Sequence, residues 1–109
     1  MNLLEEISGI GARRFWEQGT QPSDGATAAA EQALEESGIE REQIGLVVNT
    51  SVCRDWLEPS TASIVHGNLG LPDNCVNFDV GNACLAFLNG MDIAARMIER
   101  GELEHALVV

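Results

Sequence analysis

Along the chain, stretches whose apolar residues recur with helical spacing alternate with short, uniformly apolar runs. In residues 23–38, SDGATAAAEQALEESG, alanines and one leucine recur at helical spacing with glutamates on the other face. We expect a helix here, with Ser23 as its N-cap and Gly38 as its C-terminal stop. Residues 44–51, IGLVVNTS, form an apolar, β-branched run that is typical of a buried parallel strand.

The same succession of a helix and a strand is predicted twice more. A polar loop ends at Pro59, a favoured first position of a helix, and residues 59–70 then carry one apolar face before a closing glycine. Residues 75–80, CVNFDV, alternate between apolar and polar side chains with the period of a strand. From Cys84 to Gly101 the helical period returns, and HALVV then begins a third strand.

This alternation of helices and strands indicates an α/β fold with a mostly parallel sheet. The sequence stops inside an apolar run just after a helix, which leaves the last strand unfinished and its neighbours uncovered. We therefore expect residues 1–109 to be one partial domain of a larger α/β protein, with no second domain in this chain.

Composition and charge narrow the range of functions. The 109 residues are 45% hydrophobic, which suits one globular domain with a modest core. The formal charge is −11, from 17 acidic residues against six arginines and no lysine, so nucleic acids and anionic membrane surfaces are disfavoured as partners. No apolar stretch is long enough to span a membrane, and the acidic N-terminus lacks the basic region of a signal peptide. We expect a soluble, cytoplasmic protein.

The three cysteines differ in their placement along the predicted elements. Cys53, Cys75 and Cys84 have no CxxC spacing, so free thiols are expected, with no disulfide framework and no metal site. Cys84 stands where the strand-like alternation gives way to helical spacing, after three small or turn-tolerant residues. At a helix start, free backbone N–H groups stabilise a thiolate and favour a nucleophile; the alternative is a buried, inert cysteine. Cys75, at a strand start, and Cys53, in a loop, lack this placement.

Three segments of the chain resemble one enzyme family. The run FDVGNACLAFLNG, followed by a helix and EHALVV, resembles the nucleophile segment of the thiolase-like condensing enzymes, in the β-ketoacyl-acyl carrier protein synthase III family. SGIGARRF resembles the early "TGI…R" motif of that family, and residues 23–48 resemble its first crossover helix and second strand. The resemblance implies the N-terminal half of a thiolase fold: a layered α/β/α arrangement with a mixed, mostly parallel sheet, truncated at both ends.

The chemistry that this resemblance implies is a Claisen condensation. Cys84 would take an acyl group as a thioester from coenzyme A or acyl carrier protein, and the acyl group would then be joined to the α-carbon of a second thioester. The backbone N–H of Cys84 would contribute to the oxyanion hole. No cofactor is implied beyond these thioester substrates, and the full-length protein would be a homodimeric acyltransferase. The family's catalytic histidine and asparagine lie in its second half, outside this chain.

Glu58 bears on which condensation is catalysed. A malonyl donor loses carbon dioxide, whereas a plain acyl donor needs a base to remove a C–H proton. In synthase III enzymes the loop corresponding to SVCRDWLEPSTA lies at the dimer interface, and a generally apolar residue at the Glu58 position enters the partner's acyl pocket. The phrase CRDWLEP, with a glutamate at this position, is similar to the acyl-CoA condensing enzymes of bacterial olefin biosynthesis, the OleA type. This resemblance implies that Glu58 is a base, whose pKa is raised by the loss of hydration in an acyl tunnel. The alternative is an exposed partner for the dipole of the following helix.

Three functions therefore stay open for the full-length protein. The first is non-decarboxylative condensation of two fatty acyl-CoA molecules, with Cys84 as nucleophile and Glu58 as base across the dimer. The second is a synthase III of fatty acid biosynthesis that uses acyl-CoA and malonyl-acyl carrier protein, in which Glu58 is incidental. The third is a non-catalytic, thiolase-like partner subunit in which Cys84 is structural.

The remaining polar residues are weaker candidates. His66 falls within a helix and His105 directly precedes a strand, and neither is expected to be catalytic. Arg13 and Arg14 would either contact coenzyme A phosphates or lie on a solvated turn. Trp56 is a candidate interface anchor.

The resemblance also bears on the stability of the chain. The family's first strand, which this chain lacks, lies at the centre of the sheet, so we expect a gap there. We also expect the 109 residues alone to be inactive and marginally stable.

Overall fold

The computed structural model describes residues 2–109, in which helices and strands alternate as predicted. The strands form one parallel sheet in the order β2-β1-β3. The elements are α1 (Leu3–Ser8), α2 (Pro22–Ser37), the 3₁₀ turn η1 (Arg41–Gln43), β1 (Ile44–Asn49), α3 (Thr61–Leu69), β2 (Val76–Asp79), the 3₁₀ turn η2 (Ala83–Leu85), α4 (Ala86–Glu99) and β3 (His105–Val108).

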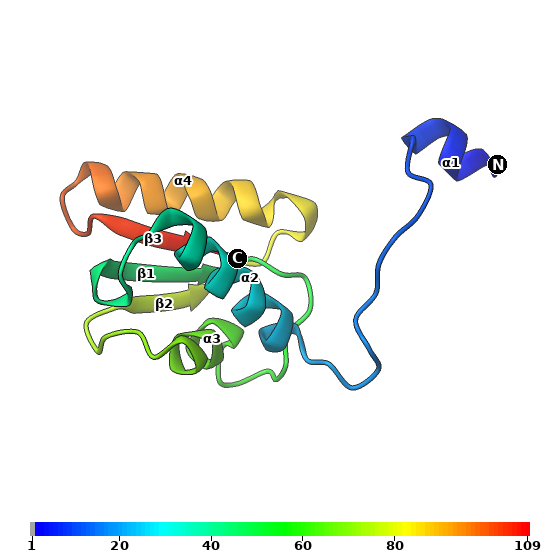
Figure 1. Ribbon diagram of the computed structural model, residues 1–109. Helices are drawn as coiled ribbons and strands as arrows, with labels where there is room; N and C mark the ends of the chain where they lie inside the picture. The colour runs from blue at the N-terminus through cyan, green and yellow to red at the C-terminus, as the bar shows by residue number, and fades with distance from the viewer. Residues whose placement is uncertain (1) are drawn as a thin grey trace.

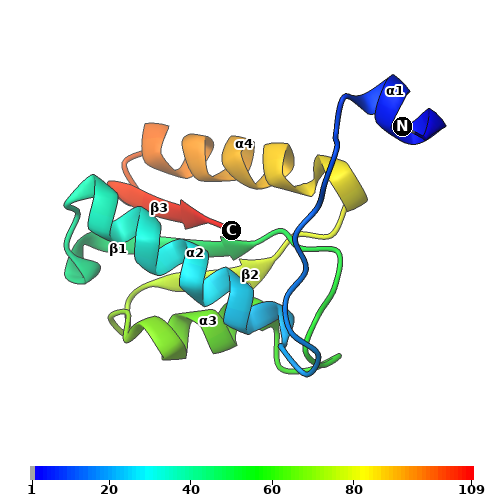
Figure 2. The same cartoon turned by 45° about the vertical axis from the view of Figure 1, so that its right-hand side comes forward.

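The sheet lies between two layers of helices, as Figures 1 and 2 show. Helices α2 and α3 cover one face, where side chains such as Leu34, Val47 and Val65 form one apolar cluster. Helix α4 covers the other face, where Leu46 and Ala94 belong to a second cluster. The expected α/β/α layering is confirmed, and the central strand is apolar because both of its faces are buried.

An irregularity near the start of β1 decides which of its side chains face which layer. The pairing with β3 shifts register between Ile44 and Leu46, so Ile44 shares a cluster with Val47 rather than with Leu46. Gly45 lies inside this irregularity, where a Cβ would be only 2.7 Å from Cβ of Leu103. The glycine therefore permits a close approach of the segment that leads into β3.

The expected gap in the sheet is wrong for this structure. Strand β1 pairs directly with β3 along its length, with Val47 opposite Leu107 and Val48 opposite Val108. Beyond the strand, the N–H of Thr50 donates to the carbonyl oxygen of Val109. An open gap would leave two strand edges with unpaired backbone groups, and direct pairing satisfies those groups.

Two helices begin at other residues than the sequence suggested. Helix α2 starts at Pro22, and Ser23 is not its cap: Asp24 instead accepts a 2.9 Å hydrogen bond from the N–H of Gln21. Helix α3 starts at Thr61, two residues after Pro59, because Ser60 supplies the capping hydroxyl. Proline thus takes the first helical position in α2, whereas in α3 the capping hydroxyl of Ser60 outweighs the same preference at Pro59.

Residues 2–15 extend away from this layered body, and Trp16 lies against Gly25 of α2. Figures 1 and 2 show α1 at the far end of an extended segment. Apolar residues of α1 and of the extended segment are exposed, among them Ile7 and Phe15. Arg13 and Arg14 lie on the extended segment. These exposed residues add nothing to the core, and the marginal stability of the isolated chain stays a prediction.

Gly90 is the residue through which α4 packs most closely on the sheet. A Cβ at this position would lie 2.8 Å from Cγ2 of Thr50 and 3.2 Å from Cγ1 of Val108. We expect Gly90→Ala to lower the free energy of unfolding by about 1–3 kcal/mol, because α4 must move off the sheet. Chemical denaturation of the purified protein measures this change.

Gly67 provides the matched control. It is an exposed glycine inside α3, and a Cβ there would meet nothing within 4 Å. Gly67→Ala should raise stability by about 0.5–1 kcal/mol through helix propensity alone. Equal effects of the two substitutions would contradict the close packing of α4.

Candidate active site

The two candidate residues are carried by segments that leave the same edge of the sheet. The loop with Glu58 follows the carboxyl end of β1, and the turn with Cys84 follows the carboxyl end of β2. In Figure 1 this green loop and this yellow turn lie at the arrowhead end of the strands. A hollow of about 300 Å³ lies between the two segments, lined by Ser51, Val52, Arg54, Asp79, Val80 and Gly81. The carboxyl edge of a parallel sheet is where α/β proteins bind ligands.

Cys84 is exposed at the junction of strand and helix. It lies in the 3₁₀ turn η2, and α4 proper begins at Ala86, two residues later than the sequence suggested. The expected alternative of a buried Cys84 is therefore wrong within residues 2–109, where the residue is exposed ahead of the helix. Its role as the nucleophile stays a prediction.

The backbone around Cys84 is held in an unusual conformation. Ala83 has a φ of 46°, in the left-handed region that a residue with a Cβ seldom adopts. The preceding residue, Asn82, makes two hydrogen bonds to residues that follow the turn. Its Nδ2 donates to Oδ1 of Asn89 at 2.7 Å, and its carbonyl oxygen accepts from the N–H of Leu85 at 3.0 Å. Such a conformation persists only where its surroundings enforce it, so the turn presents Cys84 in a fixed position.

The other two cysteines are placed as the sequence suggested. Cys53 is exposed in the loop after β1, and Cys75 is buried directly before β2. Burial raises the pKa of the Cys75 thiol above its ordinary value, which keeps the thiol protonated and unreactive.

The burial of Cys75 predicts a labelling pattern. At pH 8, iodoacetamide should modify Cys53 and Cys84 in the folded chain, whereas Cys75 should be modified only after unfolding. Peptide mass spectrometry measures the three sites separately. Modification of Cys75 at a rate equal to that of Cys53 would contradict its burial.

The same burial predicts a pH dependence of stability. Because the pKa of Cys75 is higher in the folded than in the unfolded chain, its contribution is complete below the unfolded value and is lost as the pH rises through the folded value. Stability should therefore fall on the alkaline side more steeply in the wild type than in Cys75→Ala. Denaturation curves at pH 8 and pH 10 test this difference.

Glu58 is exposed near the tip of the loop, and within residues 2–109 its carboxylate has no hydrogen-bond or ion-pair partner. The alternative role, as an exposed partner for the dipole of α3, also stays a prediction, and other side chains make the hydrogen bonds at the start of that helix. The N–H groups of Thr61 and Ala62 donate to Asp79 at 3.0 and 2.8 Å, and the N–H of Ser63 donates to Ser60. The carboxylate of Glu58 is thus free of structural bonds, and its role as a base stays a prediction.

Two aspartates near the site were missed by the sequence analysis. Asp79 bonds the start of α3, and Asp55 accepts bonds from both the N–H and the hydroxyl of Ser23, at 2.9 and 2.5 Å. Asp55 looks like a surface residue because its partner lies 32 residues earlier in the chain. For Asp79, the one available signal was an acidic residue at the end of an apolar strand.

Of the weaker candidates, the histidines and arginines lie away from this edge, and Trp56 lies on the Glu58 loop. His66, in the last turn of α3, contacts the carbonyl oxygen of Pro72 at 3.1 Å, and His105 opens β3 at the opposite edge of the sheet. Arg13 and Arg14 lie on the extended N-terminal segment, and Trp56 is exposed beside Glu58.

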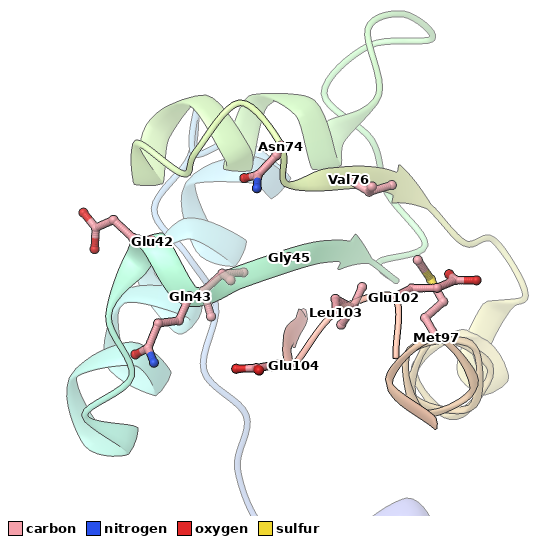
Figure 3. Close-up of a pocket in the computed structure, with 10 residues that line it drawn as sticks. Glu42, Gln43, Gly45, Asn74, Val76, Met97, Glu102, Leu103 and Glu104 are labelled. Atoms are coloured by element: carbon pink, nitrogen blue, oxygen red, sulfur yellow. The ribbon is translucent and has the colours of Figure 1, made fainter. Parts of the chain in front are cut away.

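A second hollow, of about 480 Å³, lies at the amino ends of the strands, where Figure 3 shows Glu42, Glu102 and Glu104 among its lining residues. It is formed by the starts of β1 and β2 and by the segment before β3, so it lies at the edge of the sheet opposite Cys84 and Glu58.

Among the described residues, no group of three or more histidine, cysteine or acidic side chains is arranged to hold a metal ion. In the same part of the chain, every helix is too short or too polar to cross a bilayer.

The fold and the site define a class: an α/β protein that presents a cysteine at a strand-to-helix turn on the carboxyl edge of a parallel sheet. The sequence family described as 3-oxoacyl-[acyl-carrier-protein (ACP)] synthase III matches residues 78–109. An acyl-CoA:acyl-CoA alkyltransferase from Xanthomonas campestris is 64% identical over 108 residues, which cover 99% of this chain and 32% of that protein.

Two crystal structures give the same result for the fold. OleA from Xanthomonas campestris matches with a TM-score of 0.90 and 65% identity, over 96% of this chain and 31% of that one. A 3-oxoacyl-(acyl carrier protein) synthase III, FabH, from Xanthomonas oryzae matches with a TM-score of 0.90 and 68% identity, over 96% and 31%. The chain belongs to the thiolase-like condensing enzymes of the synthase III family, as its sequence implied, and spans about a third of the length of these relatives.

Proposed function

We propose that this chain is part of a longer, homodimeric acyltransferase that condenses acyl thioesters through an acyl-cysteine intermediate. The observation that carries this proposal is the exposed Cys84 at a fixed turn on the ligand-binding edge of the sheet. The relatives that match the chain are named for acyl transfer and 3-oxoacyl synthesis, which supports the same class of reaction. The substrates would be acyl-CoA, acyl carrier protein thioesters or both, with no further cofactor, in the cytoplasm.

In the first step, the thiolate of Cys84 attacks the carbonyl carbon of the first acyl thioester. The bond from that carbon to the departing sulfur breaks, and coenzyme A or acyl carrier protein leaves as a thiolate, which takes up the proton that the Cys84 thiol lost. In the second step, a carbanion at the α-carbon of the second thioester attacks the acyl-Cys84 carbonyl. The bond from that carbonyl carbon to Sγ breaks, Cys84 leaves as a thiolate, and the product is a β-ketoacyl thioester.

Glu58 favours the condensation of two acyl-CoA molecules without a malonyl donor. Overall similarity does not decide this point, because the alkyltransferase and the synthase III structure are 64% and 68% identical to the chain. A carboxylate with no structural bonds, at the exposed tip of its loop, is suited to remove the α-proton that a plain acyl donor retains. In the homodimer, Trp56 and Glu58 would enter the site of the partner subunit, where lost hydration makes the carboxylate more basic.

Two alternatives keep some support. A synthase III that uses malonyl-acyl carrier protein would need no base at Glu58, and the 68% identity to the structure of that name favours it. A non-catalytic partner subunit would need no accessible thiol, so the exposure of Cys84 argues against it.

The donor requirement separates these functions. The longer polypeptide that carries this chain would be incubated with a radiolabelled long-chain acyl-CoA, with and without malonyl-acyl carrier protein. A β-keto product without the malonyl donor is the expected result. Product that forms only with the malonyl donor would instead support the synthase III, and absence of acyl-enzyme under both conditions would support the non-catalytic subunit.

A further inference from the structure

The loop that carries Glu58 is closed at its base by contacts to two other elements. The N–H of Asp55 donates to the hydroxyl of Thr61 at 3.4 Å, so the ends of the intervening segment, residues 56–60, lie side by side. Within this segment, Trp56 and Leu57 are exposed, 63% and 80%, and Glu58 is exposed with them. The tip itself has little packing, so its position depends on the two ends of the segment.

The first end is anchored by Asp55 to the start of α2. One carboxylate oxygen accepts from the N–H of Ser23 at 2.9 Å, and the other accepts from its hydroxyl at 2.5 Å. Ser23 is only 3% exposed, so without Asp55 its two polar groups would be buried without a partner. A carboxylate that accepts two bonds from one residue fixes direction as well as distance.

The second end is anchored by Asp79 to the carboxyl end of β2. Its two oxygens accept from the N–H groups of Thr61 and Ala62, both fully buried, at 3.0 and 2.8 Å. Beyond Asp79 the chain runs through Val80, whose N–H donates to the carbonyl oxygen of Asn49, directly into the turn that carries Cys84. One carboxylate therefore joins the base of the Glu58 loop to the strand that leads to the cysteine.

We propose that Asp55 and Asp79 are positioning residues that hold the loop in the position from which Glu58 reaches the site of the partner subunit, so that condensation depends on them and acylation of Cys84 does not. This inference rests on the proposed function, in which Glu58 acts only in the second step. Loss of an anchor lets the loop tip move without changing the turn of Cys84, which has its own Asn82 to Asn89 bond. A displacement of about 1 Å is enough to slow a proton transfer about 100-fold.

The test compares the two steps in variants of the longer polypeptide. The variants are Asp55→Ala, the conservative Asp55→Asn and Asp79→Asn, the milder Ser23→Ala, and Asp73→Ala as an exposed carboxylate control. Intact-protein mass spectrometry measures the rate of acyl-Cys84 formation, and product analysis measures condensation. Hydrogen–deuterium exchange of peptides that cover residues 56–62 measures the mobility of the loop.

In Asp55→Ala we expect acylation within about twofold of the parent, condensation at least about tenfold slower, and faster exchange in the loop. Asp55→Asn should condense faster than Asp55→Ala but more slowly than the parent. Asp79→Asn and Ser23→Ala should lose part of the parent's condensation rate. The control Asp73→Ala should match the parent. Equal losses in both steps, or unchanged condensation with faster exchange, would overturn the proposal and leave the anchors purely structural.

A Glu58→Gln variant separates this inference from the proposed function. If Glu58→Gln lowers condensation and Asp55→Ala does not, the anchoring is wrong and the base survives. If Glu58→Gln leaves condensation unchanged, Glu58 is not the base. The positioning role of Asp55 and Asp79 then falls with it, and faster exchange in Asp55→Ala would show a purely structural anchor.

Discussion

Replacing Cys84 by alanine in the longer polypeptide is expected to abolish acyl-enzyme formation and to slow condensation by at least about 1,000-fold. Alanine keeps the small volume and the turn but removes the thiol that the turn after β2 presents at the carboxyl edge of the sheet. Because Cys84 is exposed and its turn is held by backbone and Asn82 bonds, the substitution should leave the fold intact. Stability of the variant should therefore stay within about 0.5 kcal/mol of the parent.

Cys53 is the matched control for this substitution. It is a second exposed cysteine, on the loop after β1, and only its backbone carbonyl is bonded, to the hydroxyl of Ser51. Cys53→Ala should acylate and condense at the parent rate. If Cys84→Ala still forms an acyl-enzyme while Cys53→Ala does not, the assignment of the nucleophile is wrong.

Replacing Glu58 by glutamine should have the second largest effect, on one step only. Glutamine has nearly the shape of glutamate but cannot accept the α-proton, so condensation should slow by about 100- to 10,000-fold. Acylation of Cys84 should continue at the parent rate, because thioester exchange needs no carboxylate on this loop. Stopped reactions analysed for both acyl-enzyme and β-keto product give the two rates.

Glu42→Gln is the control for a general effect of charge, since Glu42 lies at the opposite edge of the sheet. It should leave both rates unchanged. Supply of malonyl-acyl carrier protein adds a further comparison: if Glu58→Gln condenses at the parent rate with the malonyl donor and the parent makes no product without it, the enzyme is a synthase III in which Glu58 is incidental.

The spacing of apolar residues predicted the individual helices and strands, because that spacing depends on one element at a time. The strand in residues 44–51 was predicted because both of its faces are buried. The helix after Cys84 was predicted from its period, although its buried residues are Ala86, Gly90 and Ala94 and large apolar side chains such as Leu88 are exposed. Helix starts were missed by one or two residues, at Ser23 and Pro59, because caps depend on which side chain reaches a free N–H. The direct pairing of β1 with β3 was not predicted, since strand partners depend on the whole chain and not on local pattern.

The site was predictable as far as it depends on residues that are close in sequence. The position of Cys84 follows from the switch of period and from the resemblance to the condensing enzymes. The contacts that position Glu58 were not predictable, because Asp55 meets Ser23 across 32 residues and Asp79 meets Ala62 across 17. The left-handed conformation of Ala83 was also missed, since alanine gives no signal for it, unlike glycine.

Peptide mass spectrometry after incubation with a long-chain acyl-CoA tests the central claim most directly. The longer polypeptide would be mixed with acyl-CoA, quenched in acid within seconds and digested, and the acyl mass would be located on one of the three cysteines. The account predicts the acyl group on Cys84 alone, with Cys53 and Cys75 unmodified. An acyl group on Cys53, or on no cysteine at all, would contradict it.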